Sequence, residues 1–326
     1  MRRTAGFTLR PLLAAGLALA FFDSSQAAPA VSYQVRTAAF ISQNATCDAE
    51  LWLPKGVQKP PVIVMAHGFG ALKSWGLDPF AERFVKAGFA VMRFDYRGFG
   101  RSGGEPRRVV DGREQVKDWL AAVESLQHRG DIDPKRLGIW GTSFSGGEVL
   151  VVAAQRAGTV KAVSAQVPMI NGFQSALRFP IKYYPLAAWY ATRDWLRKSG
   201  DTPVYVPIIS RDGFAALSCK ECAEGYGRLV PPGMESENKV AARFVWSLPF
   251  FRPAESAPNI RIPTLLIAAE QDGLIPIAGI REMVPEMSNV DYMELQGADH
   301  FSLYTGPVFE KVVDRQVTFF RRNLGH

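Results

Sequence analysis

Residues 136–147 read RLGIWGTSFSGG, and this stretch decides the fold. The apolar run Arg136–Trp140 predicts a buried strand, and a helix is expected over Gly146–Ala157. A serine on the tight turn between them needs small residues two positions before and after it. Around Ser143 those residues are Gly141 and Ser145. A frame centred on Ser145 is rejected, because the apolar strand ends at Trp140 and the nucleophile of such a turn lies close behind the strand.

Strands and helices alternate along most of the chain, which predicts an α/β fold: a mostly parallel, eight-stranded sheet with helices on both faces. The run Pro61–Ala66 (PVIVMA) is apolar throughout, as in a strand buried on both faces. The expected strands are Tyr33–Ala39, Cys47–Leu53, Pro61–Ala66, Ala90–Phe94, Arg136–Trp140, Lys161–Val167, Thr264–Ala269 and Asp291–Leu295. The expected helices are Asp78–Ala87, Asp111–His128, Gly146–Ala157, Pro185–Lys198, Ile277–Val284 and Pro307–Leu324.

A nucleophilic serine needs a base and an acid that orients the base. Of the four histidines, only His300 lies between the last expected strand and the last helix. Asp272 follows the strand Thr264–Ala269 and precedes the next helix, and no acidic residue stands in the comparable place after Lys161–Val167. The order Ser143, Asp272, His300 along the chain, at the ends of successive strands, therefore predicts a catalytic triad.

Attack on a carbonyl carbon places negative charge on the carbonyl oxygen, which preorganised N–H groups must stabilise. The loop His67-Gly68-Phe69-Gly70 follows the strand PVIVMA, and its glycines allow close approach of the backbone. We expect the backbone N–H groups of Phe69 and Phe144 to form the oxyanion hole. His67 is interpreted as a residue that shapes the loop, not as a base.

These motifs resemble those of the α/β-hydrolase superfamily, over about residues 31–168 and 259–326. The similar members are of the dienelactone-hydrolase and Xaa-Pro dipeptidyl-peptidase type, and fungal polyketide transferases are similar too. The loop Asp95–Ser102 (DYRGFGRS) also resembles a loop of the family, and we interpret it as structural. Dienelactone hydrolases carry a cysteine at the elbow where this chain has Ser143, which argues against their ring-opening reaction.

Residues 169–258 separate two strands that are expected to be neighbours, where a crossover needs about a dozen residues. This insert holds 14 aromatic residues, and the expected helix Pro185–Lys198 places Leu186, Trp189, Tyr190 and Leu196 on one side. Two interpretations stay open: the aromatics form the insert's own small core, or the insert is a lid over the active site. The residues expected to contact substrate are Trp75, Trp189 and Trp246.

The first residues resemble a secretory signal peptide in composition. Arginines precede the twelve-residue apolar run PLLAAGLALAFF at 11–22, and Ser25-Gln26-Ala27 follows with small residues at the positions that a signal peptidase reads. The apolar run is shorter than the roughly 20 residues that a spanning helix needs. We expect a signal peptide at 1–27 with cleavage after Ala27, or alternatively after Ala30, and a periplasmic or secreted product with no stable membrane anchor. The hydrolase core is then 28–168 with 259–326, and the lid is 169–258.

Composition excludes several other classes. Of the 326 residues, 47% are hydrophobic and 21% charged, as in globular proteins, and the net charge of +7 includes no basic stripe of the kind that binds nucleic acid. No dinucleotide or phosphate-binding motif is present, so no cofactor is expected. Three cysteines and four histidines do not suggest a metal site. Cys219 and Cys222 form either a structural disulfide or free thiols.

The sequence therefore predicts an exported serine hydrolase that cleaves a carboxylic ester, thioester or lactone through an acyl-enzyme. An Xaa-Pro-type peptidase is an alternative, and it needs a lid carboxylate that binds the substrate's amino terminus. An acyl or polyketide transferase is another alternative. A non-catalytic module of this fold is disfavoured, because all three triad positions are filled. Candidate carboxylates for the peptidase are Asp194, Asp201, Asp212 and Glu224.

Overall fold

The computed structural model describes Met1, residues 32–198 and residues 200–325. The chain divides into two units, residues 1–30 and 31–326, and all elements below belong to the second. The expected signal peptide at 1–27 lies outside the described residues, apart from Met1.

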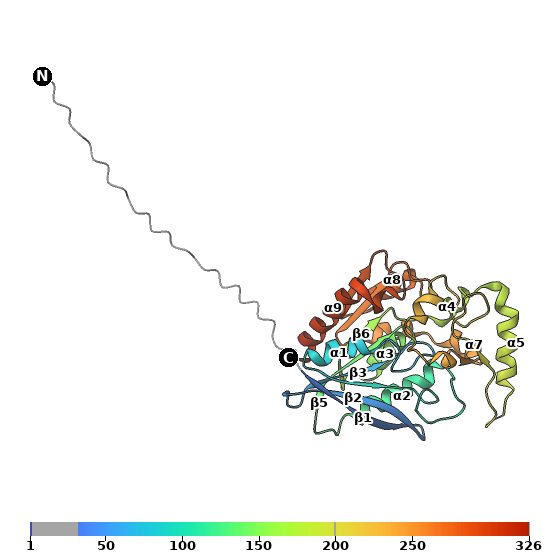
Figure 1. Ribbon diagram of the computed structural model, residues 1–326, viewed down its shortest axis with the longest axis horizontal. Coiled ribbons are helices and arrows are strands. Elements are labelled where there is room, and N and C mark those ends of the chain that lie inside the picture. Colours follow the sequence, from blue (N-terminus) through green and yellow to red (C-terminus); the bar gives the residue numbers. More distant parts are fainter. Residues whose placement is uncertain (2–31, 199, 326) are drawn as a thin grey trace. The chain divides into compact units, whose positions relative to one another are not determined.

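Eight of the described strands form one sheet in the order β1-β2-β4-β3-β5-β6-β9-β10 (Figure 1). All neighbours pair in parallel except β1 with β2 and β2 with β4, which are antiparallel. This confirms the predicted fold class. The strands are β1 Tyr33–Ser42, β2 Ala45–Pro54, β3 Pro61–Ala66, β4 Ala90–Phe94, β5 Asp133–Thr142, β6 Val160–Gln166, β9 Thr264–Ala269 and β10 Val290–Leu295.

Helices cover both faces of the sheet, as right-handed crossovers between parallel strands require. On one face α1 packs against α9, where the rings of Phe80 and Phe309 lie 4.8 Å apart. On the other face α2 packs against α3, which also contacts β5 and β6. The helices outside the insert are α1 Asp78–Lys86, α2 Gly112–Ser125, α3 Phe144–Gln155, α8 Ile277–Met283 and α9 Gly306–Leu324.

The insert leaves the sheet after β6 and returns at β9, two strands that pair directly. It is mainly helical, with one two-stranded sheet of β7 and β8, and it belongs to the same compact unit as the core. Its elements are α4 Gly172–Leu177, η1 Ile181–Tyr183, α5 Tyr184–Trp195, β7 Tyr205–Val206, α6 Cys222–Gly227, η2 Glu235–Glu237, β8 Val240–Ala241, α7 Phe244–Ser247, η3 Leu248–Phe250 and η4 Pro253–Asn259.

Two local predictions need correction. The strand at the elbow runs to Thr142 and the following helix begins at Phe144, so no spacer separates Ser143 from either element. Of the apolar residues expected on one side of α5, only Tyr190 packs inward, with its ring 5.7 Å from that of Phe214. The others, Leu186, Trp189 and Leu196, are exposed. Instead α5 buries Ala187, Ala191 and Asp194, because Asp194 forms an ion pair with Arg243 of the segment before α7.

Candidate active site

Ser143 occupies the tight turn between β5 and α3. Its backbone has φ 58° and ψ −121°, a conformation that costs energy for a residue with a side chain and that clusters at functional sites. A Cβ atom on Gly141 would lie 2.3 Å from the carbonyl oxygen of Ser145, so the turn admits only glycine at that position. The sequence requirement for a small residue two positions before the serine therefore has a direct steric cause.

Three side chains predicted from separate strand ends meet in a hydrogen-bonded relay. Ser143 Oγ lies 3.0 Å from His300 Nε2, and His300 Nδ1 lies 2.6 Å from Asp272 Oδ2. Both His300 and Asp272 are buried. Donation from Nδ1 to the carboxylate leaves Nε2 free to accept the serine proton, which is the geometry required of a base beside a nucleophile.

The two loops that carry the acid and the base are held by their own backbones. Asp272 Oδ1 accepts the N–H groups of Leu274 and Ile275, each at 2.8 Å, which leaves Oδ2 for His300. The loops are also tied together, because Gln271 N–H donates to Ala298 C=O at 2.9 Å. The separation between the carboxylate and the imidazole is thus set by main-chain hydrogen bonds.

The glycine-rich loop after β3 lies against the nucleophile. A Cβ atom on Gly68 would stand 2.9 Å from Ser143 Cβ, so only glycine lets this loop approach. Among the described residues no acceptor takes the N–H of Phe69 or of Phe144, which begins α3. Both donors sit beside Ser143 and are free for an anionic oxygen. The hydroxyl of Tyr226, in α6, donates to Phe69 C=O at 2.9 Å and so anchors this loop.

His67 belongs to the structure beneath the loop, in agreement with its interpretation from sequence. It is buried, and burial lowers its pKa to about 4. Its ring packs edge-to-face on Tyr96, with centroids 4.8 Å apart. The Asp95 loop is structural as well: Asp95 accepts the backbone N–H of Lys73 at 2.7 Å and pairs with its ammonium at 3.0 Å.

Ser145 faces a buried polar cluster under the elbow, not the relay. The hydroxyl of Tyr96 donates to Ser145 Oγ at 3.0 Å and is also hydrogen-bonded to Glu148. Trp119 Nε1–H donates to Glu148 at 3.1 Å. Burial raises the pKa of Glu148 well above its usual range, which disfavours the charged form of this carboxyl. The geometry therefore places Ser143, and not Ser145, beside His300.

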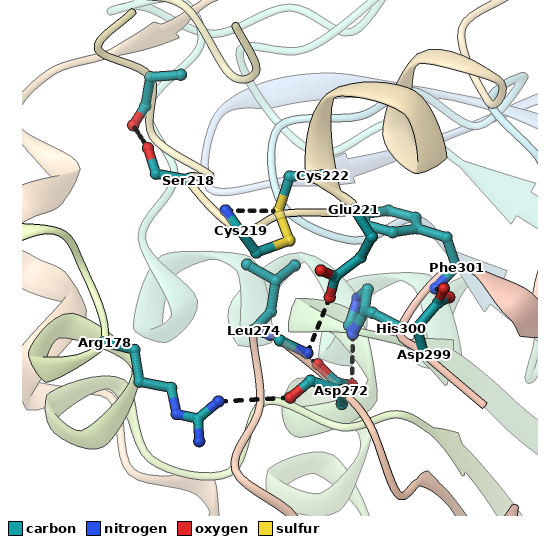
Figure 2. Close-up of a disulfide and its surroundings, with 12 residues drawn as sticks. Arg178, Ser218, Cys219, Glu221, Cys222, Asp272, Leu274, Asp299, His300 and Phe301 are labelled. Atoms are coloured by element: carbon teal, nitrogen blue, oxygen red, sulfur yellow. Dashed lines mark hydrogen bonds and ion pairs between the residues drawn. A yellow bond between two sulfur atoms is a disulfide. The ribbon is translucent and has the colours of Figure 1, made fainter. Parts of the chain in front are cut away.

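A disulfide-closed turn of the insert supports the acid loop (Figure 2). Cys219 and Cys222 are bonded, with Cα atoms 5.0 Å apart. Between them, Glu221 accepts the backbone N–H of Gly273 at 2.9 Å, directly after Asp272. The guanidinium of Arg178 donates to the carbonyl oxygen of the same peptide group, Asp272 C=O, at 3.4 Å. Sequence reasoning missed Glu221 and Tyr226, since neither lies in a motif.

Ser143 lies where two cavities meet. The larger, of about 90 Å³, lies toward Phe144 and has a mostly apolar lining, with Arg178 at its rim. The smaller, of about 20 Å³, lies toward His300 and is lined partly by Trp75 and Tyr226. Trp75 thus lines a cavity beside Ser143, and its contact with substrate stays a prediction. Trp189 and Trp246 are exposed and line neither cavity in the described part of the chain, which corrects their expected contact with substrate.

Among the described residues no three His, Cys, Asp or Glu side chains gather as metal ligands do. No helix in the described ranges is long and apolar enough to cross a membrane.

The chain is similar to several known proteins. Residues 45–199 match the model of the X-Pro dipeptidyl-peptidase (S15) family. The quorum-quenching protein AidA of Acinetobacter baumannii (strain MDR-ZJ06) is 37% identical over 286 residues, which cover 87% of this chain and 93% of that protein. Thiohydrolase aneE of Aspergillus aculeatus is 29% identical over 282 residues, covering 81% and 86% of the two chains. The crystal structure of the α/β hydrolase GrgF from Penicillium sp. sh18 superposes with a TM-score of 0.75 at 24% identity, covering 90% of this chain and all of that one.

An eight-stranded, mostly parallel sheet with a serine at the strand–helix elbow defines a hydrolase of the α/β type. The chain belongs to the α/β-hydrolase superfamily, and its residues 45–199 are similar to the X-Pro dipeptidyl-peptidase family. It is an enzyme of the α/β-hydrolase type.

Proposed function

We propose that this chain is an exported hydrolase that cleaves a carboxylic ester, thioester or lactone through an acyl-enzyme on Ser143. The observation that carries the proposal is the relay from Ser143 Oγ through His300 to Asp272, with separations of 3.0 and 2.6 Å. A hydrolase of another type, such as one with an aspartate nucleophile, has no use for a serine in this position.

The proposed reaction begins when His300 Nε2 takes the proton of Ser143 as its oxygen attacks the substrate's carbonyl carbon. The carbonyl oxygen becomes an anion and accepts the N–H groups of Phe69 and Phe144. His300 then gives its proton to the departing oxygen or sulfur, and the acyl group stays on Ser143. Water, deprotonated by His300, releases the acid. Asp272 stabilises the positive charge on the imidazole during both steps.

We assign the leaving group and the acyl group of the substrate to different cavities. The leaving group must lie within reach of His300, which protonates it, so we place it in the small cavity beside Trp75. The acyl group then occupies the larger apolar cavity, which excludes water from an aliphatic or aromatic chain. The relative named as a thiohydrolase supports testing thioesters beside simple esters, and lactones belong to the same test because they are cyclic esters.

The cavities beside Ser143 do not favour the peptidase alternative, which needs a carboxylate for the substrate's amino terminus. Neither cavity beside Ser143 is lined by a glutamate or aspartate of the described insert, and the charged residue at the rim is the cation Arg178. Asp194 is committed to Arg243, with an oxygen–nitrogen separation of 2.7 Å. A cation at the rim repels a substrate's ammonium group, which favours an ester over a peptide with a free amino terminus. Acyl transfer to an acceptor other than water stays a second candidate, since relatives include polyketide transferases.

A substrate panel tests the reaction. The purified chain should hydrolyse p-nitrophenyl esters of medium chain length, an acyl thioester and a γ-lactone, and Ser143→Ala should lower kcat by about 10⁴-fold or more. Ser145→Ala is the matched control and should keep most of the activity. Cleavage of aminoacyl nitroanilides in preference to every ester would overturn the assignment in favour of a peptidase. Faster product formation with an added alcohol or amine acceptor would identify a transferase.

Export is a separate part of the proposal. It rests on the arginines, the apolar run at 11–22 and Ser25-Gln26-Ala27. Mass spectrometry of protein from the exported fraction should find an amino terminus at Ala28 or Val31. An intact Met1 in that fraction, or a protein confined to the cytoplasm, would contradict it.

A further inference from the structure

Most large apolar side chains of α5 point outward; the exception is Tyr190, which stacks on Phe214. The buried positions of α5 are Ala187, Ala191 and Asp194, the last in an ion pair with Arg243. Trp189 is 60% exposed, and Trp195 and the adjoining Leu196 are 67% and 74% exposed. A soluble surface helix ordinarily has the reverse arrangement, with large apolar side chains against the core. Large apolar side chains that are exposed to solvent along a helix of 12 residues indicate a surface that binds another molecule or a membrane.

The outward apolar residues extend beyond α5 onto the segment before it. Leu177 at the end of α4 is 61% exposed and Ile181 in η1 is 81% exposed. These elements adjoin, because the hydroxyl of Tyr184 donates to Ala176 C=O at 3.1 Å. We call this surface the α4–α5 face; in Figure 1 the helix α5 lies at the outer edge of the insert. The apolar members of this face are Leu177, Ile181, Leu186, Trp189, Trp195 and Leu196.

The same segment is strongly basic. Between Asn171 and Lys198 the single acid is Asp194, which is buried. The cations of this segment are exposed, and none forms an ion pair with another described residue; the Arg193 guanidinium instead lies 5.8 Å over the ring of Trp189. The cations are Arg178, Lys182, Arg193, Arg197 and Lys198.

Tryptophan and leucine interleaved with arginine and lysine match a bilayer interface. Indole rings settle at the level of the lipid headgroups, aliphatic side chains enter the acyl region, and long cationic side chains reach back to the phosphates. A second copy of the chain fits less well, because a two-fold interface centred on this face would set its unpaired cations against their own copies. We propose that the α4–α5 face docks the enzyme reversibly on anionic phospholipid membranes.

The apolar cavity beside Ser143 lies next to the proposed docking face, so docking would bring this cavity close to the membrane. Ser175, Arg178 and Phe179, all from α4 and the turn after it, line the apolar cavity beside Ser143. The face and the cavity are therefore built from one segment. An apolar substrate dissolved in the lipid would meet the enzyme on the side where that cavity is lined.

Vesicle binding tests the proposal without measuring activity, so its outcome is independent of the proposed reaction. The full chain is sedimented with vesicles of phosphatidylcholine alone or with 30% phosphatidylglycerol, at low and high salt. We expect at least tenfold stronger binding to the anionic vesicles, weakened severalfold at high salt. Trp189→Ala with Leu196→Ala, and separately Arg193→Glu with Arg197→Glu, should each weaken it about tenfold.

Residues 1–30 are present in every protein compared, so any binding they contribute is the same throughout. Variants at other sites control for the loss of a charge or of an apolar side chain as such. Ile41→Ala removes an exposed apolar residue from β1, and Arg321→Glu reverses an exposed cation on α9. Both should bind as the unaltered chain does. Circular dichroism and melting temperature confirm that each variant is folded.

Three outcomes would overturn the proposal. The first is equal binding to neutral and anionic vesicles, and the second is binding that the face variants do not change. The third is absence of binding combined with a dimer, seen by light scattering, that Trp189→Ala dissociates. That last result would identify the α4–α5 face as an interface between copies of this chain.

Discussion

Glu221 should act as a positioning residue for the catalytic acid. Its carboxylate accepts the N–H of Gly273 at 2.9 Å, one residue after Asp272. A hydrogen bond to a charged group contributes about 1.5–3 kcal/mol, and because Glu221 is partly exposed we take the lower end. If most of that is lost in the transition state, Glu221→Ala lowers kcat about tenfold, since 1.4 kcal/mol corresponds to a factor of ten.

The assay is steady-state hydrolysis of the best p-nitrophenyl ester. Glu221→Ala should lower kcat about tenfold with less than a threefold change in KM, because the apolar cavity stays intact. Glu221→Gln keeps an oxygen acceptor and should restore most of kcat. Glu224→Ala is the matched control: this residue lies three positions on, is exposed, and pairs with Arg228. Refutation would be a kcat within twofold of the unaltered enzyme, or an equal loss in Glu224→Ala.

The disulfide Cys219–Cys222 should support the positioning role of Glu221. It closes a loop of four residues around Glu221, which by chain-entropy reasoning stabilises the fold by about 2 kcal/mol. Cys219→Ser with Cys222→Ser should lower the melting temperature by a few degrees and lower kcat as Glu221→Ala does. Adding Glu221→Ala to that variant should change kcat little further, because both changes act through the Gly273 N–H. Full additivity of the two losses in kcat would show that the disulfide and Glu221 act separately.

Three other changes test the elbow, the buried loop and the small cavity. Gly141→Ala drives a Cβ against the carbonyl of Ser145, so it should cost about 3 kcal/mol or more and remove activity; a stable, active Gly141→Ala enzyme would contradict the tight turn. Because burial lowers the pKa of His67 to about 4 from 6.5, the unfolded chain binds more protons between these values, and stability should fall by about 3 kcal/mol as pH drops through that range. Urea unfolding against pH should show this loss diminished in His67→Asn, and identical curves would refute it. Trp75→Phe enlarges the leaving-group side and should raise kcat/KM for esters of bulky alcohols about threefold relative to methyl esters, whereas a change in acyl-chain preference instead would place Trp75 on the other side.

Much of the core was predictable because its signals are local. The strands Pro61–Ala66, Ala90–Phe94 and Thr264–Ala269 have the observed bounds, since uninterrupted apolar runs between turn residues mark buried parallel strands. Chain order and strand ends also sufficed to pair Asp272 with His300, because parallel strands deliver their carboxyl ends to one edge of the sheet.

The packing of the insert could not be predicted from the sequence, because the contacts that determine it join residues far apart in the chain. Periodicity correctly indicated a helix at α5 but not which side is buried, which depends on an ion pair between Asp194 and Arg243, 49 positions apart. Tyr226 reaches Phe69 across 157 positions, and Glu221 reaches Gly273 across 52. The aromatic cluster expected within the insert does exist, around Phe214, but the tryptophans of α5 and α7 are not part of it.

The central claim, that Ser143 is the nucleophile, is tested most directly by covalent labelling. A fluorophosphonate reacts only with an activated serine, and trypsin then releases the peptide 137–156, which contains both Ser143 and Ser145. Fragmentation of the labelled peptide by tandem mass spectrometry should place the phosphonate on Ser143. Ser143→Ala should abolish labelling and Ser145→Ala should leave it largely intact. A phosphonate found on Ser145, or labelling that survives Ser143→Ala, would contradict the account.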